Sequence, residues 1–193
     1  MLKAFTSLLA SPDSAEHKRS SARSHAADIR DLIRRDHEEL LTLVGKLTEA
    51  RSAATRSRFL KQLAYAAPAH DKPEERAVYA ALKKATDESA DIAHEGKVEH
   101  ELVSGLLKKL SRMRDLGSDQ AKAHAEVLKE LLEHHIEEEH SEMFEQLERD
   151  FDADRRVVMG AAFLAAKQAF ARAHGSSKTA RKAASRRPAK SGR

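Results

Sequence analysis

The chain has 193 residues, of which 40% are hydrophobic, 34% charged and 4% aromatic, and it contains no cysteine. The lack of cysteine excludes disulfides, zinc–thiolate sites and iron–sulfur clusters, and the scarcity of Trp and Tyr disfavours a cofactor cage built from them. No apolar run approaches the roughly 20 residues that a membrane span requires, so we expect a cytoplasmic protein with no membrane contact.

The formal charge of +4 is distributed unevenly along the chain. Residues 175–193 hold seven basic side chains and no acidic one, which leaves −3 for the rest. Such a polar segment cannot bury a core, so we expect residues 176–193 to be a disordered basic tail. The tail could contact nucleic-acid phosphates weakly and without sequence preference, or it could serve only solubility or touch the acidic domain surface. The candidate contacts are Lys178, Arg181, Lys182, Arg186, Arg187, Lys190 and Arg193.

Helical periodicity begins near residue 26, after a flexible leader (residues 1–24) rich in serine and charge. Apolar positions with a period of 3.6 residues predict four helices, at about 26–51, 55–85, 89–114 and 120–149. The segment 116–119 (Leu-Gly-Ser-Asp) ends the third helix and caps the fourth. Helices of similar length with short connections are typical of an all-α, up-down-up-down four-helix bundle, here covering residues 25–150.

A fifth helix is predicted after the bundle. It spans about 153–174, within a segment (152–175) in which Asp152 caps its start and Gly175 ends it. Apolar residues such as Val157, Leu164 and Phe170 could cover one side or an end of the bundle.

One histidine lies on the apolar stripe of each bundle helix: His37, His70, His100 and His135. His70 and His135 are each followed four residues later by a glutamate, Glu74 and Glu139, which lies on the same helix face. The apolar spacing around these residues repeats between the two halves of the chain, which indicates two hairpins related by a pseudo-twofold axis. Because unpaired buried charge is costly, four imidazoles and two carboxylates aimed at one axis predict two bound cations. Mixed nitrogen and oxygen ligands between bundle helices suit a di-iron site best, with manganese or zinc as weaker alternatives.

Four segments of the chain resemble the hemerythrin-like family, also called the HHE cation-binding domain. They are residues 36–40 (DHEEL), 70–75 (HDKPEE) with Val78-Tyr79, 99–101 (EHE), and 135–140 (HIEEEH) with Met143-Phe144. The resemblance covers about residues 28–150. It implies that His37, His70, His100 and His135 are iron ligands, that Glu74 and Glu139 are bridging carboxylates, and that the two irons share an oxo or hydroxo bridge. The function it implies is reversible binding of O2 or NO, or sensing or storage of oxygen, iron or redox state.

The chain departs from the oxygen-carrying hemerythrins at one ligand position. Those proteins have a further histidine one turn before the third-helix histidine, where this chain has Gly96. Water or an exogenous ligand could fill the open position, as could Asp71, His94 or His140. His140 could also replace Glu139, since it follows His135 by five residues, where those hemerythrins place a carboxylate; the internal repeat favours Glu139.

Pro73 lies between His70 and Glu74 and lacks the backbone donor that would bond Ala69. We therefore expect the second helix to be kinked or restarted there. Such a kink could displace Glu74 by about one residue, and Glu75 would then be the substitute ligand.

These patterns favour a ligand binder or sensor over a dedicated enzyme, acting as a monomer or small homo-oligomer. The sequence contains no Ser/His/Asp arrangement with supporting context, no phosphate-binding loop and no dinucleotide fingerprint. Two alternatives remain open. One is a di-iron oxidoreductase acting on peroxide, and the other is a metal-free helical bundle that presents a basic tail to nucleic acid.

Overall fold

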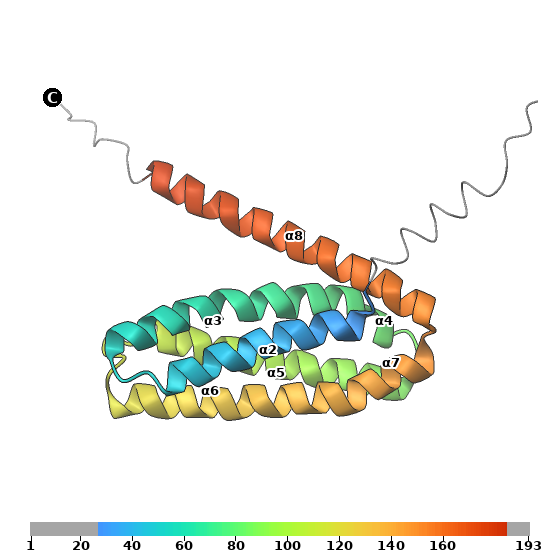
Figure 1. The fold of residues 1–193 in the computed structure, drawn as a ribbon, viewed down its shortest axis with the longest axis horizontal. Coiled ribbons are helices and arrows are strands. Elements are labelled where there is room, and N and C mark those ends of the chain that lie inside the picture. The colour runs from blue at the N-terminus through green and yellow to red at the C-terminus, as the bar shows by residue number, and fades with distance from the viewer. Residues whose placement is uncertain (1–26, 185–193) are drawn as a thin grey trace, which may run out of the picture.

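Four long helices form a bundle in which each helix contacts two others (Figure 1). In one hairpin α2 (Ile29–Thr48) pairs with α3 (Ala53–Glu74), and in the other α5 (Asp87–Ser111) pairs with α6 (Asp119–Glu138). Contacts of α2 with α6 and of α3 with α5 close the ring. The structure, a computed structural model, describes the backbone of residues 27–184 and the side chains of residues 27–174. The predicted all-α four-helix bundle is confirmed.

The second helix of each hairpin widens into a π-helix. In the first hairpin, α3 is followed by η1 (Glu75–Tyr79) and the short α4 (Ala80–Leu82). In the second, α6 is followed by η2 (Glu139–Met143) and α7 (Phe144–Asp150). A π turn holds one extra residue within an otherwise α-helical rod and frequently lies at a functional site. The two π segments occupy corresponding places in the halves to within one residue of the sequence repeat.

The second helix is not restarted at Pro73, which corrects one of the two outcomes expected there. Both Pro68 and Pro73 lie inside α3, and the widening begins only at Glu75. The equivalent widening in η2 involves no proline, so a missing backbone donor is not its general cause. Glu74 is not displaced from its predicted face, because its side chain is 0% exposed.

Side-chain caps fix where the long helices begin. The capping residues are Asp28 for α2, Ser52 for α3, Thr86 for α5, Ser118 for α6 and Asp152 for α8. Each accepts a hydrogen bond from a backbone N–H in the first helical turn, which the helix itself leaves unpaired. The caps predicted near residue 118 and at Asp152 are therefore present.

Two apolar clusters fill the bundle, one on either side of a polar layer. The first lies toward the two hairpin turns and includes Leu47, Leu63, Leu110, Leu128 and Leu132. The second lies toward the opposite end and includes Ile29, Ile33, Val78, Leu82, Met143, Leu147 and Phe163. Buried histidines and glutamates lie between them, so the polar layer is shielded from water along the bundle axis.

The last helix, α8 (Ala153–Ala184), lies across α2 and α3 (Figure 1). Its Met159 and Phe163 belong to the second apolar cluster. The helix continues beyond Gly175, where we expected it to end, because the residues that follow are mostly Ala, Ser, Lys and Arg, with no proline before Pro188. Part of the expected disordered tail is therefore helical.

The terminal segments lie outside the described residues. These are the leader at 1–24, the tail from 185 onward, and the side chains of all seven tail cations. Contact of the tail with nucleic acid stays a prediction, as do the oligomeric state and the cytoplasmic location. Among the described helices, none combines the length and apolar character needed to cross a bilayer.

Candidate metal centre

The four histidines of the apolar stripes, called the seam histidines from here on, converge in the polar layer of the bundle. They are at most 3% exposed. Nε2 of His37 lies 3.0 Å from Nε2 of His70, and Nε2 of His100 lies 3.1 Å from Nε2 of His135. Two ligand nitrogens that are each about 2.1 Å from an ion, at right angles to one another, are about 3.0 Å apart. Each hairpin thus supplies a pair of imidazoles at the separation that a shared cation requires.

Two glutamates lie between these histidine pairs. Oε2 of each faces one imidazole from each hairpin, which is the placement that a bridging carboxylate needs. The distances from Oε2 to the ring Nε2 atoms are 3.2 Å for Glu74 to His70, 3.6 Å for Glu74 to His100, 3.2 Å for Glu139 to His37 and 3.7 Å for Glu139 to His135.

The six side chains form two overlapping groups of four donors, each of which could hold a metal ion. The donor atoms within a group lie within 4.8 Å of one another, and the groups are His37, His70, Glu74 and Glu139, and Glu74, His100, His135 and Glu139. Within the described part of the chain, both oxygens of Glu74 and Oε2 of Glu139 are buried and make no hydrogen bond. Buried carboxylate oxygens that accept no hydrogen bond are costly. The donor set therefore fits a pair of cations that share both carboxylates.

Acidic residues hold two of the histidines from outside. Oδ2 of Asp36 lies 3.2 Å from Nδ1 of His70, and Oε2 of Glu99 lies 2.7 Å from Nδ1 of His135. A partner of this kind fixes the ring orientation and leaves Nε2 available to a metal. Sequence reasoning gave neither acid a role. The signal was present, since in both halves an acid directly precedes the seam histidine and reaches across to the other histidine of its hairpin.

His140 and Glu75 also face the histidines from outside. Nε2 of His140 lies 2.9 Å from Nδ1 of His37, and Oε1 of Glu75 lies 3.5 Å from Nδ1 of His100. Neither belongs to the two donor groups. Both had been predicted as substitute ligands. In the structure they contact the Nδ1 atoms of the candidate ligands His37 and His100.

The other two candidates for the open position differ from each other. Asp71 is buried, and its Oδ1 lies 3.8 Å from Nε2 of His100, at the border of the centre. His94 is exposed on the surface of α5. Asp71 is therefore the nearer of the two to the donor groups.

Tyr79 fills the space beside Gly96. A Cβ atom at Gly96 would collide with the Tyr79 hydroxyl and would lie 2.9 Å from its Cζ. The hydroxyl donates a hydrogen bond to Oε1 of Glu139. Burial raises the pKa of Tyr79 well above its ordinary value, and the negative charge of Glu139 adds to this effect. The sequence could not reveal this contact, because it depends on the fit between two separate helices.

The charges of the polar layer shift one another's protonation. Burial raises the pKa of Glu74, and the nearby Glu139 raises it further. Although burial alone would lower the pKa of His70, the charge of Glu74 and the hydrogen bond to Asp36 together raise it well above the ordinary value. In the same way, Glu139, Glu99 and Glu74 together outweigh burial and raise the pKa of His135 to about 9. Burial lowers the pKa of His37 to about 4. The field that favours a proton on two of the imidazoles also favours a metal cation.

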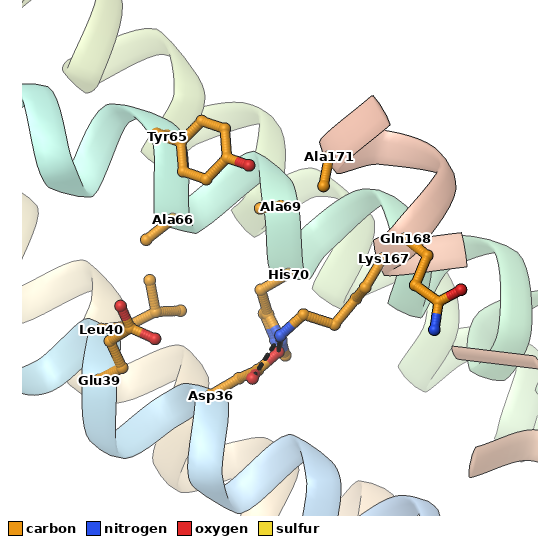
Figure 2. Close-up of a pocket in the computed structure, with 10 residues that line it drawn as sticks. All are labelled: Asp36, Glu39, Leu40, Tyr65, Ala66, Ala69, His70, Lys167, Gln168 and Ala171. Carbon is orange, nitrogen blue, oxygen red and sulfur yellow. Dashed lines mark hydrogen bonds and ion pairs between the residues drawn. The ribbon is translucent and has the colours of Figure 1, made fainter. Parts of the chain in front are cut away.

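The helix α8 reaches this centre through Lys167 (Figure 2). The Lys167 ammonium contacts both carboxylate oxygens of Asp36, the residue that holds His70. A pocket of about 380 Å³ opens beside this contact, between α2, α3 and α8, and Tyr65 and His70 are among the residues that line it. The outer edge of the centre therefore borders a surface pocket.

Comparison with known proteins identifies the domain. The hemerythrin HHE cation-binding domain matches residues 28–147. The chain belongs to this family. All six candidate ligands of this hemerythrin-like domain lie inside the matched region. Domains of this family bind cations, as their description states, and the two His/Glu groups agree with that property.

One relative and the solved structures complete the comparison. An uncharacterized hemerythrin-like protein of Schizosaccharomyces pombe is 28% identical over 136 residues, which cover 70% of this chain and 66% of that protein. The match thus spans slightly less than two thirds of the relative's length. No solved structure matches the chain.

Proposed function

We propose that the chain binds two iron ions and, through them, O2 or NO, and that it serves in the sensing or storage of oxygen, iron or redox state. One observation carries this proposal: the two groups of four donors share Glu74 and Glu139, whose metal-facing oxygens make no hydrogen bond in the described structure. Mixed nitrogen and oxygen donors between the helices of a bundle suit iron.

An iron pair supplies electrons and open coordination positions for a small ligand. The chain supplies the surroundings. Asp36 and Glu99 hold two imidazoles with Nε2 turned inward, and the apolar clusters keep the polar layer away from bulk water. Because four donors serve each ion, positions remain free for an exogenous ligand, which supports a binding role.

Iron content and the optical spectrum test the proposal directly. Protein purified without oxygen should contain about two iron atoms per chain, one for each donor group. Exposure to air should produce new charge-transfer bands, because a bound oxidant changes the electronic state of ferrous iron. Protein that contains no iron and takes up none would contradict the proposal.

Single variants assign the ligands. His37→Ala, His70→Ala, His100→Ala and His135→Ala should each lower the iron content and weaken the bands. His94→Ala is the matched control, since His94 lies on the same helix as His100 but is exposed; it should retain both. If the four variants bind as much iron as the control, the ligand assignment fails.

Two outcomes would favour the alternatives. Sustained turnover of hydrogen peroxide by iron-loaded protein, lost in His70→Ala and His135→Ala, would indicate an oxidoreductase. Iron-free protein in which His100→Ala leaves the thermal stability unchanged would indicate a metal-free bundle.

A further inference from the structure

Tyr79 is buried beside the two donor groups but belongs to neither of them. It comes from η1 in the first hairpin, yet both of its polar-layer contacts are with the second. Its hydroxyl donates to Oε1 of Glu139, and its ring stacks on His100 with centroids 5.4 Å apart and planes inclined by 15°. Tyr79 of the first hairpin thus contacts two candidate ligands of the second.

The neighbouring helix is shaped around this side chain. A Cβ at Gly96 would collide with the Tyr79 hydroxyl and would lie 2.9 Å from Cζ and 3.3 Å from Cε2. The tyrosine is 2% exposed and is packed within the second apolar cluster, so its ring has little room to retreat. A larger residue at position 96 would therefore move the hydroxyl away from Glu139.

The two carboxylates offer different atoms to a metal. Among the described residues, neither oxygen of Glu74 makes a hydrogen bond. Of the two oxygens of Glu139, only Oε2 makes none. The other oxygen, Oε1, accepts from Tyr79. Oε2 lies 3.2 Å from Nε2 of His37, so the phenol holds the carboxylate with this one oxygen turned toward the donor groups.

We propose that Tyr79 is a positioning residue that orients Glu139, so that Glu74 offers both oxygens to the metal pair while Glu139 coordinates through Oε2 alone. This inference rests on the proposed iron pair. A hydrogen bond to a carboxylate withdraws negative charge from it, and a weaker donor favours ferrous over ferric iron. Tyr79 therefore raises the reduction potential of the bound iron.

The reduction potential of the iron-loaded full-length chain tests this role. Tyr79→Phe keeps the ring and removes the hydroxyl. It should increase the affinity for ferric relative to ferrous iron by up to about tenfold, because the carboxylate regains negative charge and the full worth of one hydrogen bond to a charged group is the upper limit. Tyr65→Phe alters the chain's other tyrosine, outside the donor groups, and should leave the ratio unchanged. An unchanged ratio in Tyr79→Phe, or equal changes in both variants, overturns the proposal.

A second variant displaces the hydroxyl without deleting it. Gly96→Ala should reproduce most of the change seen in Tyr79→Phe, and it should add little in the double variant, because both act through the same hydrogen bond. Fully additive effects would contradict a shared cause.

The optical spectrum distinguishes positioning from direct ligation. A phenolate bound to ferric iron gives an intense visible charge-transfer band. We expect no such band in the ferric wild-type chain. A band that disappears in Tyr79→Phe and persists in Tyr65→Phe would show Tyr79 to be a ligand and would overturn the proposal.

A measurement on the metal-free chain separates this inference from the proposed function. The infrared C–O stretching band of Tyr79, assigned by its loss in Tyr79→Phe, should shift in Glu139→Gln and stay in place in Glu74→Gln. Absence of that shift overturns the positioning role whether or not iron binds. The expected shift in a chain that binds no iron would overturn the proposed function alone and would leave the hydrogen bond established.

Discussion

Asp28 joins two elements, α2 and α8, through a single carboxylate. Oδ1 caps α2 by accepting from the backbone N–H of Arg30, and Oδ2 lies 3.0 Å from the Arg30 guanidinium and 2.9 Å from Nε of Arg156 on α8. Although burial would raise the pKa of Asp28, the hydrogen bonds from Arg30 and Arg156 lower it to about 2. The residue thus stabilises both the start of α2 and the docking of α8.

Replacing this charge should give a pH-dependent loss of stability. Asparagine also caps helices, so Asp28→Asn removes mainly the charge and should cost about 1 kcal/mol at neutral pH, allowing for partial solvent exposure. Since the folded pKa lies below the ordinary value of 3.8, the contribution is complete above that value and is lost as the pH falls toward 2. Urea unfolding of variant and wild type near pH 7 and pH 2 measures it. The exposed Asp31→Asn is the control, and a difference that persists at pH 2 would contradict the assignment.

At the scale of elements, α8 meets the bundle at a glycine. A Cβ at Gly160 would collide with the carbonyl oxygen of Ala27 and would lie 3.2 Å from Cδ1 of Leu32. The backbone of α8 therefore packs directly against the start of α2. This contact, together with Lys167 on Asp36, holds the last helix beside the polar layer.

Gly160→Ala should destabilise the protein by about 1–3 kcal/mol, because the added methyl group forces the two helices apart. Gly45→Ala and Gly105→Ala are matched controls: both lie within bundle helices, and a Cβ at either position meets no atom within 4 Å. Alanine favours the helix over glycine by up to about 1 kcal/mol, so these controls should be neutral or stabilised. Chemical denaturation of the three variants and the wild type measures their free energies of unfolding. Gly160→Ala behaving like its controls would mean that α8 does not pack as described.

The helices and their buried faces could be predicted from the sequence, but their local geometry could not. Apolar periodicity located the bundle helices and the stripe that carries the histidines, because both follow directly from helix geometry. The π segments were missed, since one additional residue leaves apolar neighbours such as Val78 and Met143 on a buried side. The end of α8 was misplaced because a single glycine does not stop a helix whose following residues favour it.

At the scale of the whole molecule, the polar layer divides the core into two apolar clusters, so a metal bound in this layer would stabilise the folded state. The convergence of the histidines was predictable because antiparallel neighbours place mid-helix residues at similar heights. The partners Asp36, Glu99 and Tyr79 were not predicted, since each contacts a candidate ligand on a different helix. For the two acids, the repeated position before a histidine was the one available signal. Such side-chain fits depend on the three-dimensional packing of the helices.

Metal removal should therefore change both the stability of the protein and its dependence on pH. In metal-free protein, the raised pKa of His135, about 9, stabilises the fold below its ordinary value of 6.5, and this contribution disappears as the pH rises through 9. Iron bound to the His135 imidazole should suppress this pH dependence. It should also add about 4 kcal/mol to the free energy of unfolding when free iron exceeds the Kd a thousandfold. Thermal unfolding of chelated and iron-loaded protein near pH 6 and pH 9.5 checks this. Identical melting curves would exclude a metal in the layer.

The paired π segments give the chain two places where its length can change with little rearrangement. Loss of one residue within an α-helix rotates everything beyond it by about 100° and would turn an apolar face toward water. Loss of one residue from η1 or η2 would restore an ordinary α turn and leave the flanking helices in phase. Because η1 follows Glu74 and η2 begins at Glu139, loss of one residue there would alter the candidate ligands of the centre while the rest of the bundle keeps its packing.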